Sequence, residues 1–157
     1  MPGPARITQA DLEANFPQKH VRGVFSDTGQ LQPGPRLAAA CMRASRRAES
    51  ILLRAWSLDG IDVLFEEDEA IRAETCRLAM AYGVEGKTEW TGQGAPYQGL
   101  EKAALAALKD LADAEIRSRA ESLGAGANPR VSGNVSAPAE PQYTFAPSRN
   151  QPRRGGF

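Results

Sequence analysis

The clearest pattern along the chain is an apolar stripe that follows Pro33-Gly34-Pro35. Small and aliphatic side chains recur there at spacings of three and four residues, which is typical of the buried face of an amphipathic helix. The stripe consists of Leu37, Cys41, Ala44, Ala48, Ile51, Leu52 and Ala55. Proline suits the first helical position, and Ser57-Leu58-Asp59-Gly60 is expected to close the segment. The pattern therefore predicts a helix over residues 35–56.

A second helical pattern follows the acidic run Glu66-Glu67-Asp68-Glu69, because acids in a first turn complement the helix dipole. Its apolar positions are Ile71, Leu78, Ala79 and Tyr82, with Thr75 on the same face. The run Ile61-Asp62-Val63-Leu64-Phe65 that precedes it is short and predicts a β-prone or irregular segment. Residues 84–98 are rich in glycine and predict a loop.

The last helical pattern extends from Leu100 to Leu123. Its apolar line fades after Ile116, and Gly124 stands where a C-cap is expected. At the other end of the chain, Thr8 is a candidate N-cap and Asp11 stands three residues later, as in a capping box. That first helix is expected to end by residue 15, because Pro17 disfavours helical backbone just before it. Residues 16–25 then predict an irregular apolar segment, and Ser26-Asp27-Thr28-Gly29 a turn.

These elements predict an all-α fold. We expect a small helical bundle of one short and three longer helices over residues 1–123, followed by a long extended C-terminal arm over residues 124–157. The arm is rich in proline and glycine and keeps no helical or strand period. Because the core is small and rich in alanine, oligomerisation is a reasonable source of additional burial.

Charge divides the chain in the same place. The 157 residues hold 19 basic and 19 acidic side chains, so the formal net charge is zero. Residues 1–123 carry 15 basic and 18 acidic side chains, whereas the arm carries four arginines against Glu140. A neutral total argues against a protein that holds polyanions by bulk charge. The total hides an acidic body and a basic arm.

Several function classes find no support in the residues. No apolar run approaches the roughly 20 residues that span a bilayer, and no signal peptide is visible. Cys41 and Cys76 lie inside helical patterns and are interpreted as core residues, and His20 is the single histidine. We therefore expect no catalytic residues, no metal site and no cofactor.

Two sets of residues are candidates for contacts. Four arginines form a second stripe on the helix predicted over residues 35–56, at spacings of seven, four and seven: Arg36, Arg43, Arg47 and Arg54. The stripe is either a face turned to DNA or to an acidic neighbour, or an ordinary solvated face. In the loop, Trp90 and Tyr97 either anchor the loop on the body or contact a neighbouring subunit.

The order of these elements resembles the small head-to-tail connector (adaptor) proteins of tailed phages, of the Mu-like prophage type. The resemblance begins at Ile7-Thr8-Gln9-Ala10-Asp11-Leu12-Glu13 and continues through the helical stretch from Ala44 to Ile51. It includes the pair Tyr82-Gly83 at the end of a helix and the long helix from Leu100 to Ser122. The endings Phe145-Ala146-Pro147-Ser148-Arg149-Asn150 and Gly155-Gly156-Phe157 are also similar. Residues 85–99 and the arginine-rich helix depart from it.

The resemblance implies a non-enzymatic structural protein of the virion neck, at the head-tail interface, made in the host cytoplasm. Adaptors of this kind assemble as a homo-oligomeric ring, commonly of twelve subunits, beneath the portal protein. The ring extends the channel for packaged DNA, which it contacts transiently, and docks the tail or stopper protein; no membrane is involved. The alternative is a small helical nucleic-acid-binding or regulatory protein that uses the arginine stripe and the basic arm.

The arm is the expected contact with the portal. Its prolines favour an extended backbone that can lie in a groove. Its aromatic side chains are candidate anchors and its arginines can pair with carboxylates. The candidate portal-binding residues are Tyr143, Phe145, Arg149, Arg153, Arg154 and Phe157.

Overall fold

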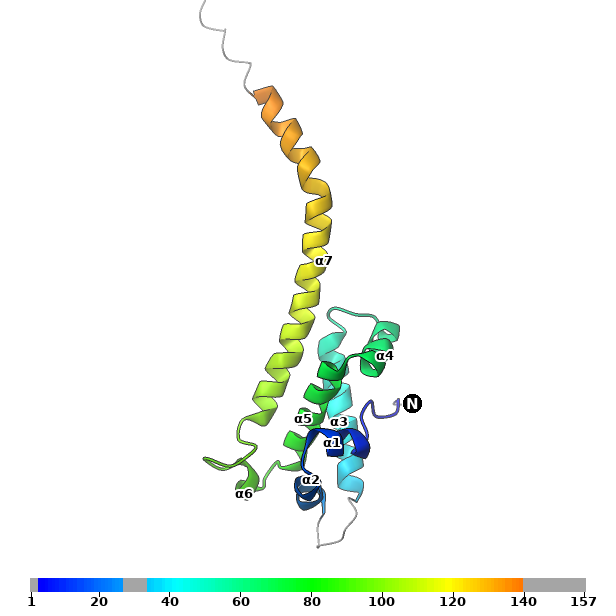
Figure 1. Cartoon of the computed structure of the whole chain (residues 1–157), viewed down its shortest axis with the longest axis vertical. Helices are drawn as coiled ribbons and strands as arrows, with labels where there is room; N and C mark the ends of the chain where they lie inside the picture. Colours follow the sequence, from blue (N-terminus) through cyan, green and yellow to red (C-terminus); the bar gives the residue numbers. More distant parts are fainter. Residues whose placement is uncertain (1–2, 27–33, 140–157) are drawn as a thin grey trace, which may run out of the picture. The chain divides into compact units, whose positions relative to one another are not determined.

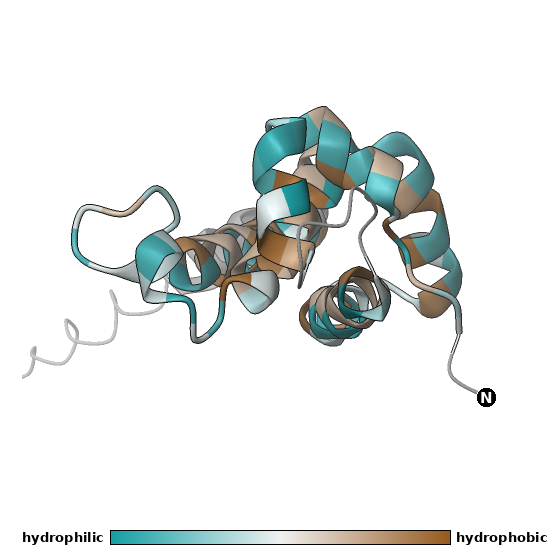
Figure 2. Cartoon of the chain, turned by 90° about the horizontal axis from the view of Figure 1, so that it is seen from below, coloured by the Kyte–Doolittle hydropathy of each residue, from teal (hydrophilic) through white to brown (hydrophobic). Residues whose placement is uncertain are grey.

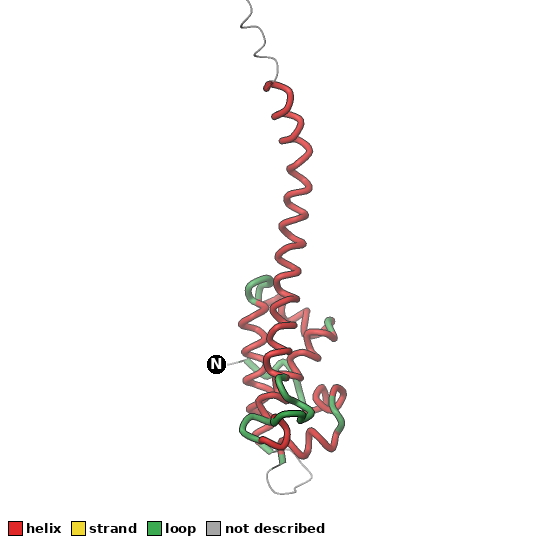
Figure 3. Tube along the Cα trace, turned by 90° about the vertical axis from the view of Figure 1, so that its left-hand side faces the viewer, coloured by secondary structure: helices red, strands yellow, loops and turns green. Residues whose placement is uncertain are grey.

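All the elements in the described part of the chain are helices, which confirms the predicted all-α class (Figure 3). The computed structural model describes residues 3–26 and 34–139, with side chains described as far as Gly124. The chain divides into two compact units, Met1–Glu115 and Ile116–Phe157. The helix α7, Leu100–Ala139, has residues in both units.

The first helix forms as its cap predicts. In α1, Gln9–Asn15, the Thr8 hydroxyl accepts from the backbone N–H of Asp11, and the Asp11 carboxylate accepts from the backbone N–H of Thr8 at 2.7 Å. This is a complete capping box. The helix ends before Phe16, whose backbone is extended, as expected for the residue before a proline.

The next segment corrects the prediction, because residues 18–25 are helical and not irregular. Helix α2, Gln18–Phe25, uses Pro17 as its N-cap residue. Val21, Val24 and Phe25 lie on one side of it and are buried. Proline ends the helix before it but also begins the next one, and the second role is the one that the linear pattern missed. Of the predicted turn over residues 26–29, positions 27–29 lie outside the described residues.

The long central helix begins as predicted and ends earlier. Helix α3, Pro35–Leu52, has Pro35 in its first turn after the N-cap Gly34. Its buried residues include most of the predicted stripe and add Ala40 and Ser45. The predicted continuation to residue 56 is wrong, because the chain turns after Leu52.

The predicted strand-like run is also helical. Helix α4, Leu58–Glu67, begins at Ser57, whose hydroxyl accepts from the backbone N–H of Gly60 at 3.2 Å. The residues expected to end a helix therefore begin one. Ile61 and Phe65, four residues apart, are the buried pair on its inner face. Spacing of four is helical, but five residues were too few to separate it from a strand.

Helix α5, Glu69–Gly83, matches the predicted third helix. The Asp68 carboxylate caps it by accepting from the backbone N–H groups of Ala70 and Ile71. Glu66 and Glu67 belong to the last turn of α4 and not to this first turn. The loop predicted for residues 84–98 includes one short helix, α6, Thr88–Thr91.

The last helix is longer than predicted. Helix α7 continues through Gly124 to Ala139, so the extended arm predicted from residue 124 is wrong for residues 124–139. Local propensity does not explain this extension, because each glycine costs about 1 kcal/mol in a helix interior and Pro129, which has no backbone N–H to donate, costs about 3 kcal/mol. Residues 140–157, with all six candidate portal-binding residues, lie outside the described residues.

The core of the first unit lies between α3 and α5, which run side by side in Figure 1. α1 and α2 cover one end of this pair, and α4 lies beside its other end (Figure 1). The residues of α7 up to Glu115 add a further layer through Ala104, Leu108 and Ala112, which are fully buried. Brown apolar positions on these helices turn toward one another in Figure 2, as burial requires.

Candidate functional site

Helix α3 presents arginines on the side opposite its buried stripe. Arg43, Arg46 and Arg47 are exposed and line a groove of about 470 Å³. The other lining residues are Ser50 of α3, Tyr82 of α5 and Glu101 of α7. We call this surface the arginine groove. It contains two of the four arginines of the predicted stripe.

Arg43 is held within the first unit. Its Nη1 donates to the Glu85 carboxylate at 2.7 Å, and its guanidinium lies over the Tyr82 ring at 3.9 Å from the centroid. The hydrogen bond to Glu85 raises the pKa of the Arg43 guanidinium. Arg43 is therefore positioned by Glu85 and Tyr82, as a planar guanidinium that stacks and pairs at the same time.

Burial, followed by the charge of Glu101, raises the pKa of the Tyr82 hydroxyl. The charges of Arg43 and Arg47 act in the opposite direction. Tyr82 therefore stays a neutral hydroxyl at ordinary pH and offers the groove a hydrogen-bond donor and acceptor.

The other two arginines of the predicted stripe lie outside the groove. Arg54 pairs with Asp113 at 2.9 Å and so joins the turn after α3 to α7. Arg36 is exposed in the first turn of α3. The stripe is thus not one continuous basic face, because acids from α7 and from the segment after α5 engage two of its members.

Sequence reasoning missed Arg46, which stands beside Arg47 but does not follow the seven-four-seven spacing. Arg46 lines the groove and also a second hollow of about 410 Å³. In that hollow, Arg6 pairs with Glu49 at 2.6 Å and with Asp62 at 2.5 Å, and its backbone N–H donates to Ser45 at 2.8 Å. These contacts fasten the N-terminal segment to α3 and α4.

Trp90 and Tyr97 lie in an aromatic cluster with residues of the N-terminal helices. The rings of Trp90 and Tyr97 stack at 5.7 Å between centroids, and Phe16 meets Tyr97 edge-on. His20 Nδ1 lies 2.6 Å from the Tyr97 hydroxyl. Tyr97 is 9% exposed. The cluster anchors the loop on the body, and a subunit contact through Trp90 or Tyr97 stays a prediction.

The cysteines are core residues in the structure. Cys41 and Cys76 are free and buried. Burial raises the pKa of the Cys41 thiol to about 11 and that of the Cys76 thiol to about 12. Both thiols are protonated at neutral pH, which makes them poor nucleophiles and poor metal ligands.

The described residues show neither a metal-binding group nor a membrane-spanning helix. No group of three or more histidine, cysteine or acidic side chains in them is arranged to hold a metal ion. Within the same ranges, none of the helices combines the length and apolar character that crossing a bilayer requires.

Comparison with known proteins identifies no relative: no protein-family model, no curated protein and no solved structure matches the chain.

Proposed function

We propose that this chain is a structural subunit of a head-to-tail connector of a tailed phage, and that it forms a ring beneath the portal protein. The observation that carries the proposal is the order of the helices together with the residues at their ends. A short helix is capped at Thr8, the long α3 includes Ala44 to Ile51, α5 ends on Tyr82-Gly83, and a long helix follows. The sequence resemblance implies this order.

In this proposal the ring extends the channel for packaged DNA and docks the tail or stopper protein, and the assembled subunit belongs to the neck of the virion. Residues 138–157 bind the portal through their aromatic and arginine side chains. Aromatic and arginine residues often contribute most of the binding energy at interfaces.

The direct test is to mix the purified chain with the portal protein of the same phage and to average the particles by electron microscopy. The expected result is a closed ring of added density coaxial with the portal. Portal particles without such a ring, at a large excess of the chain, would refute the connector function.

A second experiment tests the arm separately. Deleting residues 140–157 keeps every described helix and is expected to abolish co-purification with the portal. The control is a chain in which the order of residues 140–157 is scrambled, because it keeps the charge and composition of the arm. If the wild-type chain, the deletion variant and the scrambled variant all co-purify equally with the portal, the arm does not bind it. The connector function itself would then still be tested by the electron-microscopy experiment.

One observation favours the alternative, a nucleic-acid-binding or regulatory protein: Arg46 and Arg47 are exposed beside each other in the arginine groove. This alternative predicts duplex binding that weakens steeply with salt, because each neutralised phosphate releases counterions. It also predicts that Arg46→Glu with Arg47→Glu removes that binding. The connector predicts little affinity for free duplex, since packaged DNA must slide through the channel.

A further inference from the structure

The lining of the arginine groove has three arginines and one acid, Glu101, so it carries a net positive charge. Glu85 engages Arg43, whereas in the described part of the chain no ion pair engages Arg46 or Arg47. Ser50 and Tyr82 add hydroxyl groups to the same hollow. Paired guanidinium groups beside hydroxyl donors suit carboxylate ligands, since arginine can bind a carboxylate with two parallel hydrogen bonds.

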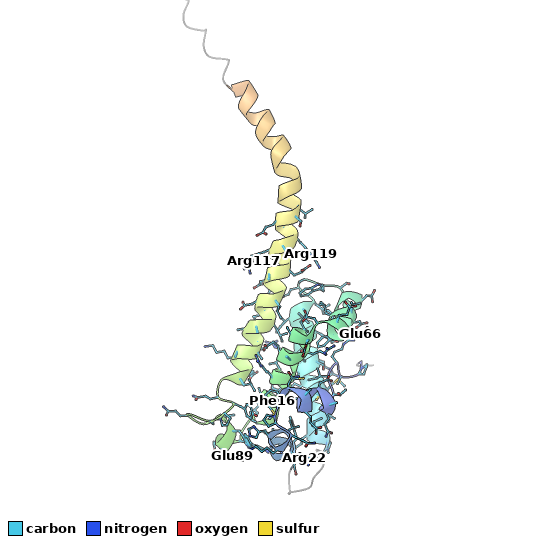
Figure 4. The ribbon with its side chains drawn as sticks, viewed as in Figure 1. Phe16, Arg22, Glu66, Glu89, Arg117 and Arg119 are labelled. Carbon is cyan, nitrogen blue, oxygen red and sulfur yellow. The ribbon has the colours of Figure 1, made fainter. Side chains whose placement is uncertain are left out.

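The opposite charge gathers where α4 meets α5. Residues 55–71 contain six acids and no basic residue. Glu66, Glu67 and Glu69 are exposed there, and no ion pair engages them among the described residues. We call these three residues the acidic corner. Figure 4 shows Glu66 on α4, at the outer edge of the first unit.

The acidic corner is held in place by backbone contacts. Arg72 Nη1 donates to the backbone carbonyls of Phe65 at 2.9 Å and of Glu66 at 2.6 Å. The Asp68 carboxylate caps α5 in the same turn. The three carboxylates are therefore presented on a fixed backbone, which lowers the entropy that a partner must remove on binding.

Within one copy, no ion pair among the described residues joins the arginine groove to the acidic corner. Glu69 is the first residue of α5, and Tyr82 is its penultimate residue. A rise of about 1.5 Å per residue separates them by roughly 20 Å along the helix. Tyr82 of the groove and Glu69 of the corner thus lie at opposite ends of α5, in the same unit.

We propose that the arginine groove of one copy of this chain binds the acidic corner of a second copy. Glu66 and Glu67 pair with Arg46 and Arg47, while Arg43 stays on Glu85. The surfaces differ, so the contact is head-to-tail, and such contacts generate rings when the rotation closes. The inference rests on the proposed function and names the residues of one subunit contact.

The charges of the groove and the corner determine which surfaces associate more than how tightly they associate. An exposed ion pair typically strengthens association by about fivefold or less, whereas like charges placed opposite each other weaken it by a much larger factor. Reversing the charge on one surface is therefore more informative than removing it. We expect reversal of either surface to weaken association of the chain by at least about tenfold.

The experiment uses the full chain at fixed ionic strength, with sedimentation over a range of concentrations. One variant reverses the groove, with Arg46→Glu and Arg47→Glu, and another reverses the corner, with Glu66→Arg and Glu67→Arg. Each is expected to lose association alone. A mixture of the two is expected to associate again, because each surface then meets its complement. A four-fold variant with both surfaces reversed is expected to self-associate and not to join the wild-type chain.

The control variants carry the same change of charge at other exposed positions. Lys19→Glu with Lys109→Glu matches the groove variant, and Glu89→Arg with Asp110→Arg matches the corner variant; all four side chains are exposed. Glu89 lies away from Glu66 in Figure 4. The circular dichroism spectrum of each variant serves as the check that the variant is folded. The controls are expected to associate as the wild-type chain does.

Three outcomes overturn the proposal. They are a wild-type chain that stays monomeric, association that neither reversal weakens, and reversals that weaken association while neither the mixture nor the four-fold variant restores it. Duplex binding that depends on Arg46 and Arg47 would assign the groove to nucleic acid. Mixing the same variants with the portal distinguishes a wrong contact between copies from a wrong connector function. A normal ring from the groove variant refutes only the contact, and a wild-type chain without a ring refutes the connector.

Discussion

Substitution of Gly83 by alanine is expected to destabilise the protein, although alanine is the better helix former. Gly83 is the last residue of α5 and is buried. A Cβ placed on it would lie 2.5 Å from Phe25 Cζ and 2.7 Å from Val24 Cγ1. Both are buried side chains of α2. The absence of a side chain at Gly83 thus allows α2 to pack directly on the end of α5.

The magnitude follows from two opposed effects. Forcing an extra carbon into a packed core typically costs about 1–3 kcal/mol. Replacing glycine by alanine inside a helix returns up to about 1 kcal/mol, and less at the last helical residue. The free energy of unfolding of the Gly83→Ala variant is therefore expected to fall by about 1–2 kcal/mol.

Gly23 provides the matched control. It lies in α2 and is exposed, and a Cβ there would meet Trp90 Cζ2 at 3.4 Å, which is ordinary van der Waals contact. The Gly23→Ala variant is expected to gain about 0.5–1 kcal/mol. The same chemical change thus has opposite signs at two positions.

The assay is urea unfolding followed by circular dichroism at one protein concentration, since association would shift apparent stability. The Phe25→Leu substitution, which removes the ring atoms nearest to Gly83, is expected to cost less in the Gly83→Ala background than in the wild-type background. A Gly83→Ala variant as stable as the wild type, or additive costs in the double variant, would refute this packing.

Three further predictions concern the cap, the aromatic cluster and the thiols. Thr8→Ala removes the capping box of α1 and is expected to cost about 1 kcal/mol in urea unfolding, whereas Thr8→Ser retains most of it. Tyr97→Phe leaves His20 Nδ1 without its partner and is expected to cost about 1 kcal/mol, with faster hydrogen exchange over residues 84–99. The free energy of unfolding is expected to fall as pH rises above about 9, because unfolded thiols ionise there while burial holds the pKa of Cys41 at about 11 and that of Cys76 at about 12. Urea series at about pH 8 and pH 10 check this, and Cys41→Ala with Cys76→Ala should flatten the dependence.

The helices that the sequence predicted are those with strong local signals. The Thr8 cap, Pro35 and the stripe of α3, and the acids before Ile71 are all local, and they located α1, α3 and α5. The missed helices α2 and α4 have eight and ten residues. Isolated helices of that length are marginal in water, and packing against the rest of the fold stabilises them. That packing is not present in the linear pattern.

The same limit applies to the candidate site. Spacing along α3 identified Arg43 and Arg47, because both lie on the side opposite the apolar stripe. It could not show that Glu85 engages Arg43 or that Asp113 engages Arg54, since these acids lie more than 40 residues away in the chain. The tertiary fold decides which arginines form an ion pair, and among the described residues none engages Arg46 or Arg47.

The acids of the corner do not stabilise the folded monomer, so the stability of a single chain does not explain their presence. Glu66 and Glu67 lie in the last turn of α4, where the helix dipole is negative and acids are unfavourable by about 0.3–1 kcal/mol each. Arg72 offsets part of this cost through the carbonyls of Phe65 and Glu66. Reversal of Glu66 and Glu67 to arginine should therefore leave the folded monomer as stable as before, or more stable, while it weakens association. A structural role for these carboxylates would move both quantities in the same direction, so the two measurements on one variant separate a folding role from a contact between copies.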